Sequence, residues 1–293
     1  MARMAARPVA ERLRLGLLLG PAALMLALAI AVPRWAMFFG GGALAWAVAT
    51  WLLWQGQSQI GYRAAIRHLR RNQLTEAIAA MDALIAAEPE QAGHYRFRAE
   101  LHRLAGDLDA AERDYQQVMR LSPGSADGYL GLAEVAIQRG EYAEAQQYAQ
   151  RAAQCAADDW RVRYTRALLA DRLVDAREAL ESAQAALSAG LADRRMAVLL
   201  HLWRVRAYAR LGDLDSAQAA LHDLRASASG LQDWGRVLDS PQAAALRALM
   251  ADDLRDAQAL LKSGAETLLV RWHAETLASA SAQRQEVDRG RRS

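Results

Sequence analysis

This 293-residue sequence repeats itself every 34 residues. Alanine recurs at this interval in two series of constant phase: Ala65, Ala99, Ala133 and Ala167, and Ala77, Ala111, Ala145 and Ala179. Other residue types repeat at the same spacing: Tyr95 and Tyr129, Gly106 and Gly140, Pro89 and Pro123. A fixed period of this length is typical of stacked supersecondary units, none of which buries its apolar face alone.

Each unit is predicted to be a pair of antiparallel helices. Alanine, leucine, arginine, glutamate and glutamine favour helices, and the chain has only 6 prolines. Two helices approach closely only where small residues lie at their crossing, so the alanine series mark that crossing. Glycine readily adopts the positive φ that ends a helix, so Gly106 and Gly140 mark the turn between the two helices.

The clearest copy of the unit runs from Ala92 to Pro123 and reads AGHYRFRAELHRLAGDLDAAERDYQQVMRLSP. It resembles the tetratricopeptide repeat, with Tyr95 opening the first helix and Ala99 at the crossing. The resemblance covers residues 60–261. It implies an all-α solenoid of about five to six helix pairs over residues 58–280, closed by a capping helix at 266–280. The tail, residues 281–293, is polar and is expected to be disordered.

The pattern changes in its later copies. Val174 stands where the earlier copies have glycine, and the alanine spacing stretches to 38 residues at Ala217 and then to 40 at Ala257. We therefore expect longer loops or helices near residues 190–194 and 227–234. Residues 241–261 are interpreted as a degenerate helix pair.

The first part of the chain has a different composition. Two runs, residues 15–33 and 35–54, carry no charge, and each is about as long as the hydrocarbon thickness of a bilayer when helical. They predict an N-terminal two-helix transmembrane hairpin over residues 15–54, after a basic flank at residues 1–14. A hairpin lying in one leaflet and a cleaved signal peptide are the alternatives.

Arginines lie on both sides of this segment, and their placement predicts its orientation. The positive-inside rule puts both termini and the repeats in the cytoplasm, in a multi-pass protein of the bacterial inner membrane that contacts lipid through residues 15–54. Glycines in the two runs are candidate helix-packing positions: Gly16, Gly20, Gly40, Gly41 and Gly42. They serve either packing of the two helices on each other or homo- or hetero-oligomerisation.

The sequence contains few residue patterns typical of metal, cofactor or catalytic sites. Six histidines are scattered without a metal-ligand spacing, and Cys155 is the single cysteine, so no metal site is expected. No glycine-rich loop follows a strand and no credible nucleophile motif is present, so we predict no cofactor and no enzyme activity. Nucleic-acid binding is disfavoured because acidic residues are interleaved with the arginines, which leaves a net charge of only +3.

The family resemblance implies that the inner face of the first helices binds a protein or peptide. Mapped onto this sequence, the expected groove positions are Arg96, Glu100, Arg103, Leu130, Glu134, Ile137, Tyr164, Leu168 and Asp171. The leading hypothesis is a scaffold or assembly factor that recruits a partner at the membrane. The alternative is a structural subunit of a larger membrane complex, held through the predicted hairpin.

Overall fold

The computed structural model describes residues 21, 23–31, 34, 42–46, 60–189, 191, 193–240, 243–262 and 265–290. The chain divides into two compact units, residues 1–67 and 68–293. In the first unit the described segments are short helical stretches, and a helix over residues 60–70 runs into the second unit. The candidate site lies in the second unit.

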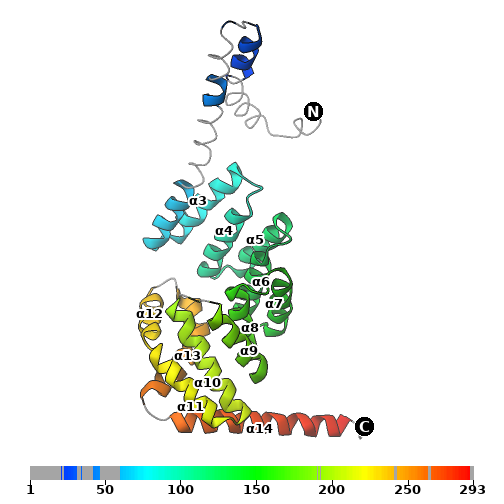
Figure 1. Cartoon of the computed structure of the whole chain (residues 1–293), viewed down its shortest axis with the longest axis vertical. Helices are drawn as coiled ribbons and strands as arrows, with labels where there is room; N and C mark the ends of the chain where they lie inside the picture. The colour runs from blue at the N-terminus through cyan, green and yellow to red at the C-terminus, as the bar shows by residue number, and fades with distance from the viewer. Residues whose placement is uncertain are drawn as a thin grey trace. The chain divides into compact units, whose positions relative to one another are not determined.

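The second unit consists of α-helices in its described residues (Figure 1). Successive helices pair and stack: α3 packs on α4, and the pairs α4–α5, α6–α7, α8–α9 and α10–α11 follow along the chain. Their bounds are α3 Leu74–Ala87, α4 Ala92–Ala105, α5 Leu108–Leu121, α6 Ala126–Arg139, α7 Tyr142–Cys155, α8 Trp160–Arg172, α9 Ala176–Ser188, α10 Arg194–Leu211 and α11 Leu214–Ala226. The repeat array that the period predicts is present.

In two of the pairs the turn follows from two adjacent residues, a glycine and an aspartate. Gly106 has a φ of 82° and ends α4, while the Asp107 carboxylate accepts a hydrogen bond from the Ala110 backbone N–H at 3.0 Å and caps α5. Gly212 and Asp213 repeat this arrangement between α10 and α11. The glycine provides the left-handed conformation, and the aspartate satisfies an N–H that the new helix leaves unpaired.

The alanine series lie where the helices cross. Ala99, Ala111, Ala133 and Ala145 are fully buried, as are their equivalents in the next pair. Neighbouring pairs also depend on a small residue, because the Tyr115 ring of α5 occupies the space that a Cβ atom at Gly131 of α6 would need. Small residues therefore set both the spacing within a pair and the spacing between pairs.

After α11 the chain departs from the repeat pattern. Three more helices follow: α12 Ser229–Leu238, α13 Ala244–Lys262 and α14 Ala265–Gly290. The long interval near residue 230 holds α12, and the predicted helix pair at 241–261 is instead the single helix α13. The final helix reaches Gly290, so it includes most of the tail that we expected to be disordered. The tail's alanine, glutamine, glutamate and arginine residues are good helix formers, which accounts for this difference.

The predicted transmembrane hairpin is not supported. Within the described part of the chain, no helix combines the length and the apolar character that crossing a bilayer requires. A span needs about 20 apolar helical residues, whereas the longest helical stretch described within residues 15–54 is 23–31. The fold class is therefore corrected: the described residues form an all-α solenoid, and they give no support to the hairpin.

The same finding overturns the predicted location as a multi-pass inner-membrane protein. Among the proposed packing glycines, Gly16, Gly20, Gly40 and Gly41 lie outside the described residues, as does the flank at 1–14. Gly42 is described, and a Cβ atom there would lie 3.1 Å from the Met25 sulfur.

The turn between α8 and α9 carries backbone strain. Val174 has a φ of 61° at the position that glycine holds in three other pairs, and it is exposed. A β-branched residue in this conformation places its Cβ against the backbone, at a cost of about 1–2 kcal/mol.

Replacing Val174 with glycine should therefore stabilise the protein. We expect Val174→Gly to raise the free energy of unfolding by about 1 kcal/mol, because relief of strain exceeds the entropy that glycine adds to the unfolded chain. Urea denaturation measures the change, with Gly140→Val as the reverse substitution, expected to destabilise. A Val174→Gly protein that unfolds at lower urea than the parent would contradict the account.

Candidate protein-binding face

The first helices of successive pairs form a continuous row. Helices α4, α6, α8 and α10 contact one another in that order, each also packing on the second helix of its own pair. We call the side of this row turned away from the second helices the first-helix face. All nine predicted groove positions belong to α4, α6 and α8. The face has two parts that differ in exposure.

The open part lies on α4, α6 and the start of α8. It consists of polar and charged side chains that are partly exposed: Arg96, Glu100, Arg103, Asp127, Glu134, Gln138 and Arg161. Arg103 Nη2 contacts the carboxylates of both Glu100, at 3.1 Å, and Glu134, at 2.8 Å. Its Nη1 donates to Gln138 Oε1 at 3.2 Å. The Arg103 guanidinium thus forms ion pairs with two carboxylates from different helices.

A second group of ion pairs joins the N-terminal ends of the same three helices. Asp127 Oδ1 lies 3.3 Å from Arg96 Nη1 and 2.8 Å from Arg161 Nη1. Arg161 also pairs with Asp159. Desolvation acts to raise the pKa of Asp127, but the two guanidinium groups outweigh it and lower that pKa.

The Glu134 carboxyl group has the opposite balance. Desolvation raises its pKa, Arg103 counteracts this only in part, and the nearby Glu100 carboxylate adds to the increase. Arg161 of α8 acts in the same direction as Arg103. Desolvation of the Glu134 carboxyl group, together with the Glu100 charge, therefore outweighs the two arginines and keeps its pKa raised.

The closed part begins at the C-terminal half of α8. Helix α10 packs against α12, α13 and α14 as well as against the solenoid helices. Counted from the turn glycines, Leu202, Arg206 and Ala209 of α10 are equivalent to Arg96, Glu100 and Arg103 of α4, and all three are buried. The C-terminal helices therefore cover this end of the first-helix face.

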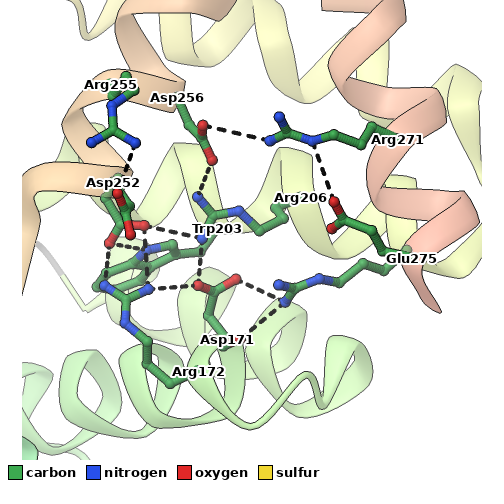
Figure 2. A network of polar contacts seen from close by, with 11 residues as sticks. Asp171, Arg172, Trp203, Arg206, Asp252, Arg255, Asp256, Arg271 and Glu275 are labelled. Carbon is green, nitrogen blue, oxygen red and sulfur yellow. Dashed lines mark hydrogen bonds and ion pairs between the residues drawn. The ribbon is translucent and has the colours of Figure 1, made fainter. Parts of the chain in front are cut away.

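A buried ion network fixes α13 on α8 and α10 (Figure 2). Asp253 of α13 accepts hydrogen bonds from Arg172 Nη2 at 2.7 Å, from Arg206 Nη1 at 3.0 Å and from the Trp203 indole N–H at 3.1 Å. Asp171 of α8 accepts from Arg206 at 2.5 Å and from Arg210 at 3.0 Å. The network thus joins residues up to 81 positions apart in the sequence.

The outer contacts of the network reach α14. Asp256 accepts from Arg206 Nη2 at 3.0 Å, and Arg271 of α14 lies 3.8 Å from the other Asp256 oxygen. The Trp272 ring lies over the Arg206 guanidinium, 5.2 Å from centroid to Cζ. Three arginines, 172, 206 and 210, thus face three aspartates, 171, 253 and 256, and their charges balance.

Comparisons with known proteins identify the repeats. Two tetratricopeptide-repeat family models match the chain, at residues 62–126 and 102–171. Residues 62–171 therefore consist of tetratricopeptide repeats. Repeat proteins of this family bind protein or peptide partners, and their fold indicates a role in protein–protein interaction or assembly. Such scaffolds are generally not enzymes.

Individual proteins also resemble this chain, each over part of its length. Cellulose synthase 1 operon protein C of Komagataeibacter xylinus is 33% identical over 97 residues, which are 33% of this chain and only 7% of that protein. Among solved structures, the APC/C assembly Cut9–Hcn1 matches with a TM-score of 0.52 at 20% identity, covering 69% of this chain and 41% of that one. PilW, a type IV pilus biogenesis factor, matches with a TM-score of 0.50 at 15% identity, covering 77% and 92%. At these identities the two structures show the fold alone.

The predicted groove positions separate into three outcomes. Arg96, Glu100, Arg103 and Glu134 lie together on the open part. Leu130, Ile137 and Leu168 are buried in the core, so these three predicted positions offer almost no surface to a partner. Tyr164 packs on Trp203, with 5.2 Å between ring centroids, and Asp171 is buried in the ion network.

Sequence reasoning missed Arg206 and Asp253, the centre of that network. Arg206 is one of five arginines in α10, so the sequence does not single it out, and its partners are 35 to 50 residues away. In the described residues, no three His, Cys, Asp or Glu side chains are arranged to hold a metal ion.

Removing the charge of Asp253 should destabilise the protein strongly. Asp253→Asn leaves the Arg172 and Arg206 guanidinium groups short of a buried counter-charge, and we expect a loss of about 3 kcal/mol or more in the free energy of unfolding. Urea denaturation at pH 7 measures it, and the exposed Asp252→Asn is the matched control.

The destabilisation caused by Asp253→Asn should also depend on pH. Desolvation opposes ionisation of Asp253, but Arg206 and Arg172 outweigh it, so the folded protein has a lowered pKa at this carboxyl. A lowered folded pKa contributes stability above the ordinary aspartate pKa of about 3.9, and that stability is lost as pH falls through the folded value. The difference between parent and Asp253→Asn should therefore shrink below about pH 4. A difference that stays constant from pH 7 to 3 would contradict this role.

Proposed function

We propose that this chain is an interaction scaffold that binds a partner polypeptide on the open part of its first-helix face. The observation that carries the proposal is the difference between the two parts of the face. The closed part is covered by α13 and α14, whereas α4 and α6 present Arg96, Glu100 and Glu134 with side chains 47%, 41% and 38% exposed.

The character of the open part supports this assignment. Stacked helix pairs provide an extended, rigid surface, and rigid surfaces bind with little loss of conformational entropy. The charged side chains there are already held by ion pairs between neighbouring helices. A bound segment therefore meets preoriented hydrogen-bonding groups from three helices.

The coverage at α10 limits the length of the partner contact. A bound segment has access to α4, α6 and the first half of α8, beyond which the face is occupied by the chain's own α13. The scaffold is therefore expected to recognise a short segment.

Site-specific photocrosslinking tests the proposal. A photoreactive amino acid replaces Arg96 on the open part or, as the matched control, Arg113, an exposed arginine on the second helix α5. In cells that produce the protein, we expect a defined protein adduct from position 96 and none from position 113. Equal adducts from both positions, or none from either, would overturn the proposal.

A further inference from the structure

Exposed apolar side chains gather on three segments of the second unit: the α8–α9 turn, the α10–α11 turn and α14. In the described part of residues 68–293, every large apolar side chain that is exposed belongs to one of them, with an exposed fraction of 38% to 59%. The set, which we call the apolar edge, is Leu173, Val174, Leu211, Leu214, Val270 and Leu277. Single exposed apolar residues are ordinary on a protein, whereas a group of neighbouring ones marks a contact surface.

Helix α14 packs directly against the α10–α11 turn (Figure 1). A Cβ atom at Gly212 would lie 2.9 Å from Cε1 of the His273 ring, and the two leucines of the edge in this turn flank that glycine. Val270, His273 and Leu277 are three and four residues apart, so they lie on one side of the helix. The exposed residues of α14 therefore border those of the α10–α11 turn.

The α8–α9 turn lies beside the α10–α11 turn. Arg210, near the end of α10, donates a hydrogen bond to the Asp171 backbone carbonyl at 3.0 Å, two residues before the α8–α9 turn reaches the apolar edge. Across the same boundary, Ala207 of α10 and Ala176 of α9 pack in one cluster. The apolar edge thus extends from the α8–α9 turn across the next turn to α14.

Val174 indicates that stability does not account for the edge. It holds a φ of 61° where three other pairs have glycine, and its side chain is exposed. Glycine at this position is expected to give a more stable protein, as argued above for the α8–α9 turn. A strained residue with an exposed apolar side chain is typical of a position kept for a contact rather than for folding.

Carboxylates border the apolar edge. Asp175, Asp213 and Asp215 follow its turn residues and are exposed, and Glu266 is exposed one helical turn before the first edge residue of α14. Asp175 and Asp213 each accept a hydrogen bond from a backbone N–H, but among the described residues none of the four carboxylates has an ion-pair partner. Arg177, at the start of α9, is an exposed cation near this border. The border is therefore predominantly acidic.

We infer that the apolar edge binds an amphipathic helix of a partner polypeptide, with lysines or arginines beside its apolar stripe. The exposed residues Val270, Ala274 and Leu277 repeat at the spacing by which one helix packs along another. A helix laid along α14 also covers the leucines of the neighbouring turn, and its basic residues meet the carboxylates at the border. This surface is separate from the open part of the first-helix face and goes beyond the proposed function.

Site-specific photocrosslinking with identification of the crosslinked segment is the first test. A photoreactive amino acid replaces Leu277 or, as the matched control, the exposed Arg113 of α5. In cells that produce the full-length chain, we expect position 277 alone to give an adduct. Mass spectrometry should place it in a segment with apolar residues three and four apart and lysines or arginines beside them. No adduct, an adduct to lipid or to a second copy of the chain, or a segment without this pattern would overturn the inference.

Binding of the identified segment then locates the contact. The segment is synthesised with a fluorescent label, and its affinity for the full-length protein is measured by fluorescence anisotropy. Val174→Gly and Leu277→Ser should each weaken binding at least about fivefold, whereas Arg113→Ser should bind as wild type. Because Val174→Gly is expected to stabilise the fold, weaker binding by this variant does not arise from unfolding.

Changing the lysines and arginines of the peptide to glutamine should weaken binding at least about tenfold, and added salt should also weaken it. Binding that is unchanged by both Val174→Gly and Leu277→Ser, or by loss of the peptide's basic residues, would contradict the inference. Arg96→Glu, on the open part, should leave this affinity unchanged. If Arg96→Glu abolishes binding, the segment binds the first-helix face, which would overturn the inference and leave the proposed function intact.

Discussion

The C-terminal half of the structure depends on the buried guanidinium group of Arg206. It is 5% exposed and contacts Asp171 of α8 and Asp253 and Asp256 of α13, while Trp272 of α14 covers its face. A buried charge is stable only when its neighbours compensate for lost hydration. Because the compensating groups come from three helices, Arg206 permits only the arrangement in which α13 and α14 return to the first-helix face.

This arrangement gives the repeat array two unlike ends. A regular array continues by placing each new pair on the preceding second helix, but here α14 packs mainly on the first helix α10, and α13 lies against both α10 and α12. The closed part is consequently saturated in charge, whereas the open part retains carboxylates that share a single guanidinium. The same interaction that completes the fold at α10 thus leaves only α4, α6 and the beginning of α8 accessible to the proposed partner.

The repeat period was sufficient to predict the helix pairs from α4 to α9. Alanine at the crossings and glycine at the turns act on residues that are near in the sequence. The helices and turns that they produce can therefore be predicted from the sequence. The exposure of a first-helix position is not local: Leu130 and Ile137 occupy the same register as Arg96 and Arg103, yet they are buried by neighbouring helices. The buried ion network around Arg206 joins residues 35 to 50 positions apart in the sequence. These residues follow no repeat, so no periodic pattern predicts the network. The membrane hairpin was predicted from two uncharged runs and the arginines around them, and no helix in the described residues combines the length and the apolar character that it requires.

Hydrogen exchange of the full-length protein tests most directly whether α13 is an integral cover of the first-helix face. The account predicts that the backbone amides of α13 exchange as slowly as those of α10, because both helices open only when the buried ion network is broken. Rapid exchange throughout α13 and the adjoining part of α14, while α4 to α10 remain protected, would contradict it. That result would mean that the arginines of α8 and α10 are not held by the C-terminal helices and that the whole first-helix face is open.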